Sequence, residues 1–367
     1  MYDIGRSRRA SKAFSFDEIA LVPSRRTRGT EEVNLAWRID AIKLDFPIVA
    51  APMDSVMSPA TAIAMGKLGG LGVLNLEGLW TRYADPAPIF DELAAIEDQV
   101  SATKRMQELY AAPIQPDLIE ARMAEIRAAG VPVAGSLSPQ NTREFADVVV
   151  KASPDFFVIR GTTVSAEHVS KDSDPLDLKT FIRTLDVPVI VGGCAGYQTA
   201  LHLMRTGAAG VLVGFGGGAR HANRDVLGIE VPMASAVADV AEARRDYLDE
   251  SGGRYVHVIA DGAVGRSGDI AKAIACGADA VMVGAPLARA TEAPGKGYHW
   301  GAEAWHASLP RGERVKFETI GSLDEIMNGP SVTPDGSMNL VGALRRAMAS
   351  TGYTDVKEFQ RIELVII

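Results

Sequence analysis

Short runs of consecutive apolar residues recur along the chain, and most are followed by a segment with helical spacing. Continuous apolar runs are typical of parallel strands, which are buried on both faces and lose the alternation of apolar and polar positions. Eight runs fit this description: 47–52, 71–75, 131–137, 156–160, 187–191, 210–213, 255–260 and 280–283. Eight such strands alternating with helices predict an α/β fold, a (β/α)8 TIM barrel. A doubly wound open sheet is the structural alternative.

The stretch from Tyr83 to Gly130 breaks this rhythm. Its charged and apolar residues alternate at helical spacing, and prolines interrupt it at positions 86, 88, 113 and 116. The stretch is therefore predicted to be a helical segment that the prolines break. We expect residues 1–367 to form a single domain around the barrel.

Three loops rich in glycine and small residues follow the last three predicted strands. The first holds four glycines within five residues, in Val213-Gly-Phe-Gly-Gly-Gly218, and the others span 261–269 and 284–287. Glycine lets main-chain N–H groups approach an anion closely, because no Cβ stands in the way. In a barrel these loops meet at the carboxyl ends of the strands, where phosphate is commonly held. The sequence predicts an anion-sized site there; glycine-rich turns without a ligand are the alternative.

Composition narrows the classes of function. No run of about eighteen apolar residues occurs and the basic N-terminus lacks an apolar stretch, so we expect a cytoplasmic protein with no membrane partner. A net charge of −8 argues against a nucleic-acid surface. The basic residues near the N-terminus are interpreted as a solvated or subunit-facing surface. They are Arg6, Arg8, Arg9, Lys12, Arg25, Arg26 and Arg28.

Metal and disulfide chemistry find little support in the sequence. Cys194 and Cys276 are the only cysteines, so no disulfide framework or Cys-based zinc site is predicted. Buried structural thiols are the expected state of both. The six histidines show no metal-ligand spacing, and no metal site is predicted from them.

Several segments resemble the IMP dehydrogenase/GMP reductase family of purine-nucleotide barrels. They are the opening segment 14–23, Ala51-Pro-Met-Asp-Ser-Val56, Ile259-Ala-Asp-Gly262, residues 283–287 and the tail 339–348. The resemblance runs nearly end to end and is closest to the IMP-dehydrogenase-related proteins that lack the CBS-domain pair. It implies a single barrel with no CBS insertion, in which the helical segment 83–130 stands where that pair is usually inserted.

The resemblance implies a bound purine nucleoside monophosphate. Asp261 would hold the ribose hydroxyls, backbone of the glycine loops would hold the phosphate, and Met53 would lie against the purine. A carboxylate is a natural acceptor for paired hydroxyls, although a residue that caps the following turn is the alternative for Asp261. The implied nucleotide-binding residues are Ala51, Met53, Gly216, Gly217, Gly218, Asp261, Gly262, Ala263, Gly284, Ala285 and Tyr298.

The chain departs from the family at the reacting centre. In the family, a cysteine in the loop after strand six attacks carbon 2 of the purine, which allows hydride transfer to or from a nicotinamide cofactor. No cysteine lies between Gly214 and Asp239, and His221 is the candidate catalytic residue in that loop. Arg160 stands where the resemblance predicts an aspartate facing the nicotinamide, so Arg160 and Gly161 are the implied cofactor-binding residues.

The phosphate loops and the flap also differ from the family. Ala263 and Ala285 stand where a glycine and a serine are usual. The flap segment 289–316, which in the family brings an arginine and a tyrosine over the intermediate, offers Tyr298 and the distant Arg311 and Arg314.

Two functions therefore stay open. One is an oxidoreductase that converts IMP to XMP with NAD, or runs a GMP reductase-type reaction, using a substitute for the thiolate. The other is a catalytically inactive purine-nucleotide-binding sensor or partner subunit. A phosphosugar lyase or isomerase is a third hypothesis, because a phosphate site alone does not determine which reaction is catalysed. The resemblance implies NAD or NADP, a potassium ion and a homotetramer.

Overall fold

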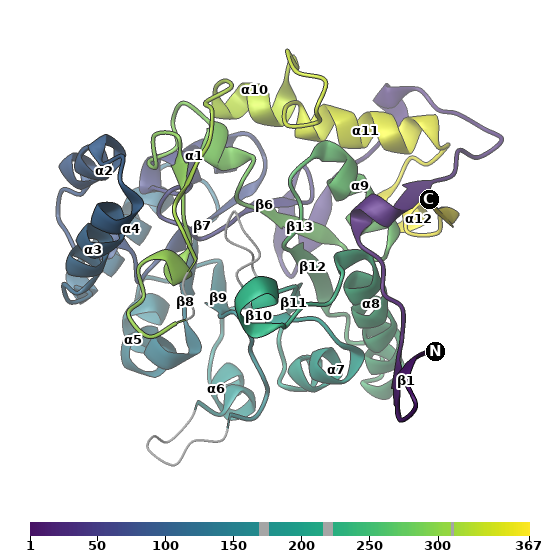
Figure 1. Ribbon diagram of the computed structural model, residues 1–367, viewed down its shortest axis with the longest axis horizontal. Coiled ribbons are helices and arrows are strands. Elements are labelled where there is room, and N and C mark those ends of the chain that lie inside the picture. Colours follow the sequence, from purple (N-terminus) through teal and green to yellow (C-terminus); the bar gives the residue numbers. More distant parts are fainter. Residues whose placement is uncertain (169–175, 216–222, 310–311) are drawn as a thin grey trace.

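The centre of the molecule is a closed barrel of eight parallel strands (Figure 1). The computed structural model describes residues 1–168, 176–215, 223–309 and 312–367. The barrel strands are β6 (Ile48–Ala50), β7 (Leu71–Asn75), β8 (Ala134–Leu137), β9 (Phe156–Arg160), β10 (Val189–Cys194), β11 (Gly210–Val213), β12 (His257–Asp261) and β13 (Ala280–Val283). Each overlaps one predicted apolar run. Because β13 pairs with β6, the sheet closes and the (β/α)8 prediction is confirmed over an open sheet.

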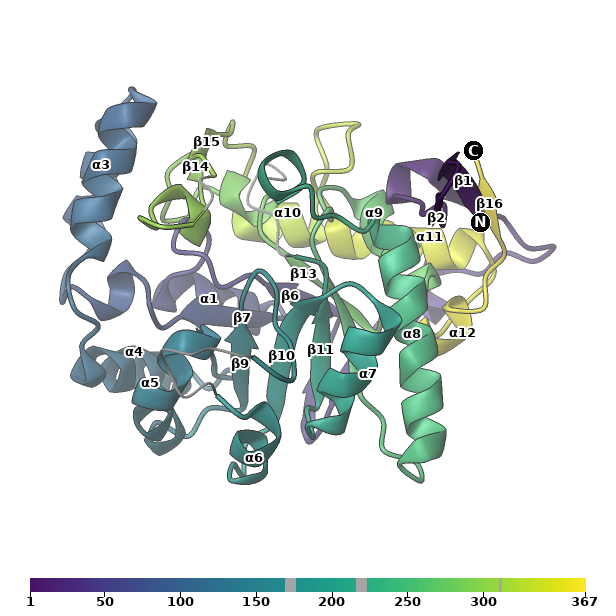
Figure 2. The same cartoon turned by 60° about the horizontal axis from the view of Figure 1, so that its bottom comes forward.

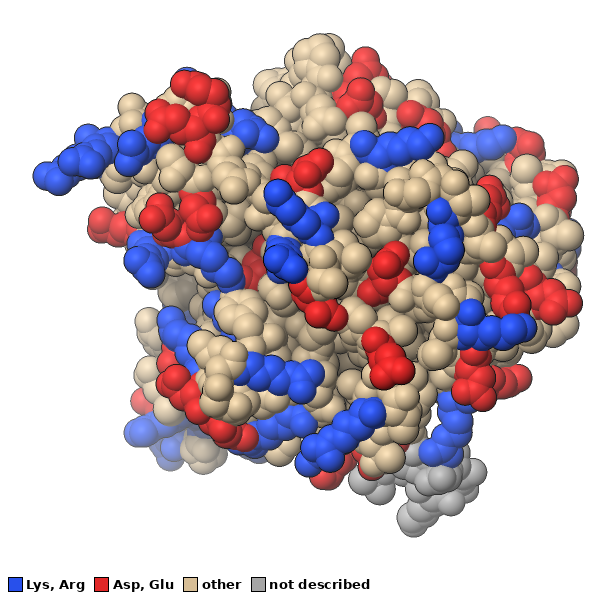
Figure 3. Space-filling view, turned by 180° about the vertical axis from the view of Figure 1, so that it is seen from behind, with Lys and Arg blue, Asp and Glu red and all other residues tan. Residues whose placement is uncertain are grey.

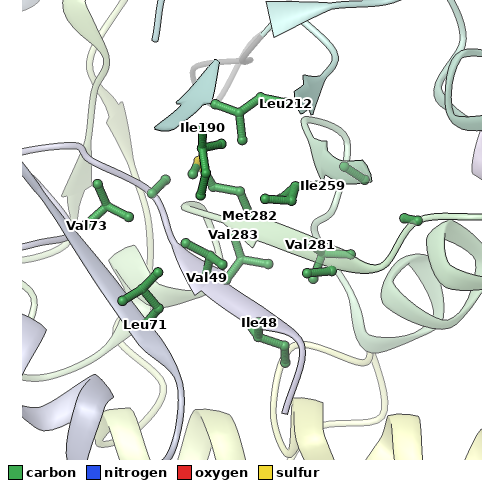
Figure 4. Packing of buried hydrophobic residues seen from close by; sticks show 14 of the residues in the cluster. Ile48, Val49, Leu71, Val73, Ile190, Leu212, Ile259, Val281, Met282 and Val283 are labelled. Carbon is green, nitrogen blue, oxygen red and sulfur yellow. The ribbon is translucent and has the colours of Figure 1, made fainter. Parts of the chain in front are cut away.

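Apolar side chains fill the barrel, so it is a packed core and not a pore (Figure 4). Every residue of β8, β10, β11 and β13 is buried. Leu212, Ile259 and Val281, which come from three neighbouring strands, have no exposed surface. This two-sided burial explains why the strands read as continuous apolar runs.

Helices surround the barrel, and local sequence signals start several of them. Ser58 and Ser138 each precede a proline, and their side chains accept hydrogen bonds from the amides of Thr61 and Asn141. Serine at the N-cap followed by proline is a strong helix start. The surrounding helices are α1 (Pro59–Lys67), α5 (Pro139–Lys151), α6 (Leu178–Arg183), α7 (Tyr197–Arg205), α8 (Met233–Glu250), α9 (Ser267–Ala275), α10 (Leu323–Asn328), α11 (Leu340–Ser350) and α12 (Val356–Phe359).

The segment 83–130 contains α2 (Ala87–Ala95), α3 (Gln99–Tyr110) and α4 (Pro116–Ala128). Helix α4 packs on α1 and α5 against the barrel. Helices α2 and α3 instead share a second apolar cluster with residues of the flap segment, among them Tyr298 and Trp300. Figure 2 shows α3 standing beside the hairpin of β14 (Tyr298–His299) and β15 (Val315–Lys316). This segment therefore supports the flap.

Short peripheral strands complete the fold. Strands β3 (Ile19–Leu21) and β16 (Leu364–Ile366) pair near the two ends of the chain, and β4 (Trp37–Ile39) pairs with β5 (Ile42–Leu44). The N-terminal hairpin of β1 (Tyr2–Gly5) and β2 (Arg8–Ala10) is exposed throughout. On the face shown in Figure 3, acidic and basic side chains are interspersed. Among the described residues, no helix is long and apolar enough to cross a membrane.

A buried charge cluster, which was not predicted from the sequence, lies at the amino end of the barrel. Asp279, just before β13, has no exposed surface. Its carboxylate accepts hydrogen bonds from Arg244 Nη1 at 2.8 Å and the Tyr255 hydroxyl at 2.7 Å, and it pairs with Lys357. Burial raises the pKa of Asp279, but Arg244, Lys357 and His257 together lower it to about 2.

His257 opens β12 beside this cluster and stays neutral in the folded protein. Its Nδ1 accepts a hydrogen bond from Trp37 Nε1 at 3.2 Å. Burial lowers the pKa of His257 from 6.5 to about 4; Lys357 and Arg244 act in the same direction, and Asp279 opposes them. The unfolded chain therefore binds more protons between those two values. The contribution of His257 to stability is complete above pH 6.5 and is lost as the pH falls towards 4.

We expect the free energy of unfolding to fall by about 2 kcal/mol between pH 7 and pH 5 on account of His257. His257→Gln removes this titration, so its decrease should be smaller than that of the wild-type protein by that amount. Urea unfolding at both pH values measures it, with His202→Gln, an exposed histidine on α7, as the matched control. Equal decreases in the wild-type protein and His257→Gln would contradict the assignment.

Candidate functional site

A cavity of about 500 Å³ opens at the carboxyl ends of the barrel strands. Arg160 and Asp261, the last residues of β9 and β12, reach it, together with Met53 beyond the end of β6. The loops after β12 and β13 complete the wall. Ligand sites of TIM barrels lie at this end, because the loops that follow the strands converge there.

Most of the predicted nucleotide-binding residues lie together. Those that line the cavity are Ala51, Met53, Asp261, Gly262, Ala263, Gly284 and Ala285. The predicted residues Gly216, Gly217, Gly218 and His221 lie outside the described residues. Of the two residues predicted for the cofactor, Arg160 lines the cavity. Gly161 directly follows β9, and its N–H donates a hydrogen bond to Gly192 O of β10 at 2.8 Å.

Among the described residues, Tyr298 is not part of the cavity lining. Only 8% of it is exposed, and its ring packs in the second apolar cluster. The guanidinium of Arg314 lies 3.8 Å from the centre of that ring and donates to the carbonyls of Leu93 and Ile96 at the end of α2. Arg314 therefore ties the flap to α2. Arg311 lies outside the described residues.

The loop after β12 has an unusual backbone. Gly262 and Ala263 have φ values of 136° and 54°, the region that favours glycine. A non-glycine residue in the left-handed region costs roughly 1–2 kcal/mol. Ala263 stands where the family resemblance predicts a second glycine. Asp269 of α9 stabilises the loop, because its carboxylate accepts hydrogen bonds from the amides of Gly265 and Arg266 at 3.1 and 3.0 Å.

An ion pair crosses the mouth of the barrel. Arg160 Nε lies 2.8 Å from Asp261 Oδ2, and Arg160 Nη2 lies 3.3 Å from Oδ1. The side chain of Asp261 is 6% exposed and that of Arg160 is 19% exposed. Burial lowers the pKa of Arg160, but the charge and hydrogen bonds of Asp261 outweigh it and leave the pKa above its usual value. The two strands are not neighbours in the barrel, so sequence reasoning missed the pair.

The flap brings a further carboxylate, that of Glu303, to the cavity. Glu303 lines the cavity, and its Oε1 accepts a hydrogen bond from the Thr162 hydroxyl at 3.2 Å. A Cβ built on Gly301 would lie 3.2 Å from Met53 Cε, so the flap backbone passes directly over Met53. Glu303 was missed because the flap sequence has no periodicity that places its side chains.

Buried hydrogen bonds fix the loop that carries Met53. Asp54 Oδ2 accepts from the Tyr110 hydroxyl at 2.6 Å and from the Leu79 amide at 2.8 Å, and the same hydroxyl accepts from Trp300 Nε1 at 3.0 Å. Burial raises the pKa of Asp54, although these hydrogen bonds oppose the shift. Helix α3, the loop after β6 and the flap are thus joined at one buried carboxyl group.

The two cysteines are unsuited to act as nucleophiles. Cys194, at the end of β10, is 1% exposed, and burial raises its pKa to about 12. Cys276, just after α9, also has its pKa raised by burial to about 12. A thiol must ionise to attack or to bind a metal, so both side chains are neutral at physiological pH. Cys194 is buried as expected, whereas Cys276 is only half-buried.

Together the fold and the site define a TIM barrel with a polar ligand cavity at the carboxyl ends of its strands. Residues 13–312 match the family model described as the IMP dehydrogenase / GMP reductase domain. The chain belongs to the IMP dehydrogenase/GMP reductase family.

Individual relatives agree with this assignment. The chain is 53% identical to an uncharacterized oxidoreductase of Mycolicibacterium smegmatis, with 100% of both chains covered. It is 26% identical to the inosine-5'-monophosphate dehydrogenase of Methanocaldococcus jannaschii, covering 98% of this chain and 93% of that protein. The crystal structure of an IMP dehydrogenase/GMP reductase-like protein from Corynebacterium glutamicum superposes with a TM-score of 0.95 at 51% identity, covering 100% of this chain and 97% of that one.

Proposed function

We propose that this oxidoreductase-like protein binds a purine nucleoside monophosphate in the cavity at the carboxyl end of the barrel. The observation that carries the proposal is the convergence of Asp261, Met53 and the two short phosphate loops on one cavity. A buried carboxylate suits paired ribose hydroxyls, and main-chain N–H groups beside residues without large side chains suit a phosphate. The flap and Met53 provide an apolar surface against which a purine can lie.

The predicted cofactor site meets a difficulty in this chain. The family generally uses NAD, and the nicotinamide would lie beside Arg160. A guanidinium carries the same sign of charge as an oxidised nicotinamide ring, whereas the resemblance predicts an aspartate there. Arg160 is also engaged by both oxygens of Asp261. These residues do not fit NAD or NADP in the family's manner.

A non-redox role as a nucleotide sensor or partner subunit is the second candidate. It is favoured by the absence of cysteine from residues 214–239 and by the neutral, buried state of Cys194. Calorimetry with IMP, XMP, GMP and NAD, alone and in pairs, separates the candidates, because an oxidoreductase binds NAD as well as the nucleotide and a non-redox sensor binds the nucleotide only. The resemblance also implies a homotetramer and a potassium ion. Light scattering and nucleotide titrations with and without potassium test them.

Asp261→Ala should weaken binding of the preferred nucleotide by roughly 1.5–3 kcal/mol, the range for a hydrogen bond to a charged group. The change removes the acceptor of the ribose hydroxyls. Calorimetric titration measures the dissociation constant, and Asp249→Ala, an exposed carboxylate on α8, is the control. A dissociation constant that Asp261→Ala leaves unchanged would rule out this ribose site.

A further inference from the structure

The carboxylate of Asp261 is already occupied by the protein itself. Each of its oxygens accepts a hydrogen bond from Arg160, through Nε and Nη2. The arginine side chain is the more exposed of the two, at 19% against 6%. Both side chains line the cavity, so a ligand that takes the same two hydrogen-bonding positions on Asp261 must displace the guanidinium.

Replacement requires a matched pair of donors. The guanidinium offers two N–H groups in a fixed fork that fits both carboxylate oxygens at once. The two neighbouring hydroxyls of a ribose can restore both hydrogen bonds. A sugar with a single hydroxyl restores one and leaves the other buried oxygen short of a donor, which is costly.

The displaced guanidinium also needs a partner, because a partly buried charge without one is expensive. Glu303 lines the same cavity and contributes to the electrostatic stabilisation of charged Arg160. Thr162, two residues after Arg160, already holds the Glu303 carboxylate at 3.2 Å. Glu303 lies on the flap, so a move of Arg160 from Asp261 towards Glu303 adds a contact between β9 and the flap.

We propose that Arg160 is a specificity-determining residue that covers Asp261 and yields it only to a ribose with both hydroxyls, moving to Glu303 when the nucleotide binds. The proposal rests on the proposed function, since it names the sugar that this nucleotide site selects. It follows that this site discriminates against 2′-deoxynucleotides more strongly than the Asp261 carboxylate would without Arg160.

The test is calorimetric titration of GMP and 2′-deoxy-GMP into four proteins: the wild-type protein, Arg160→Gln, Glu303→Gln and the double variant. IMP and 2′-deoxy-IMP serve equally well as the pair of ligands. Arg105→Gln, which breaks an exposed ion pair with Glu92, is the matched control. Arg160→Gln should reduce the preference for the ribonucleotide by about tenfold or more, and ribonucleotide binding should tighten, because no guanidinium has to be displaced from Asp261. Glu303→Gln should weaken ribonucleotide binding about tenfold, and the double variant should not.

Two results would overturn the proposal. If Arg160 only orients Asp261, then Arg160→Gln weakens ribonucleotide binding and leaves the preference for ribose unchanged. If Glu303→Gln, a change at a partly exposed residue, binds both nucleotides like the wild-type protein, Glu303 does not receive the guanidinium. Thermal unfolding of each variant checks that it is folded. Failure of the wild-type protein to bind any purine monophosphate would instead reject the proposed function.

Discussion

Incubated with IMP and NAD, the purified protein is expected to form NADH about 10⁶-fold more slowly than members of the family that carry the loop cysteine. In the family, formation of the covalent thiolate adduct is the step that makes carbon 2 of the purine a hydride donor. Residues 214–239 contain no cysteine. Cys194 and Cys276 cannot substitute, because burial raises the pKa of both to about 12.

Absorbance of the reduced cofactor measures this, with NADH formation from IMP and NADPH consumption with GMP followed at several pH values and with potassium. A thiolate-bearing family member assayed in parallel is the control. Turnover of about 1 s⁻¹ or more, within the ordinary range for enzymes, would refute the prediction. In that event His221→Ala decides whether the loop histidine replaces the thiolate.

The barrel could be predicted because its determinants are local in the sequence. Each strand is a short apolar run, and β9 coincides with the predicted run 156–160. The end of β10 differs from the prediction, because the strand continues through Gly192 and Gly193 to Cys194, beyond the predicted 187–191. In the fold these glycines permit close approach, since a Cβ on Gly193 would lie 1.8 Å from Gly214 O.

The site was only partly predictable, because its side chains come from elements that are distant in sequence. Residues that end a strand or follow it directly, such as Asp261 and Gly284, could be placed at the carboxyl end by topology alone. The partner of Asp261 could not, because the Arg160 side chain crosses the mouth of the barrel between strands that do not pair. Tyr298 lies in a segment without strand or helix periodicity, and packing against Arg314 and α2 decided where it points.

Asp279→Ala should destabilise the protein by about 3–5 kcal/mol at pH 7, the cost of breaking a buried ion pair by removing one partner. The variant leaves the Arg244 guanidinium and the Lys357 ammonium beside one another without their shared carboxylate, and the amide of Val258 loses its acceptor at 2.8 Å. The pKa of Asp279 is lowered to about 2 from 3.8, so its contribution is complete above pH 3.8 and is lost as the pH falls towards 2.

Urea unfolding of the wild-type protein and Asp279→Ala at pH 7 measures this difference. Glu250→Ala is the matched control, since it breaks the Arg205–Glu250 pair, whose side chains are 40% and 46% exposed. Exposed pairs contribute roughly 0.2–1 kcal/mol, so the control should change little. If Asp279→Ala costs no more than Glu250→Ala, the buried cluster does not stabilise the amino end of the barrel. A large loss confined to Asp279→Ala shows that the buried charge cluster stabilises the amino end of the barrel.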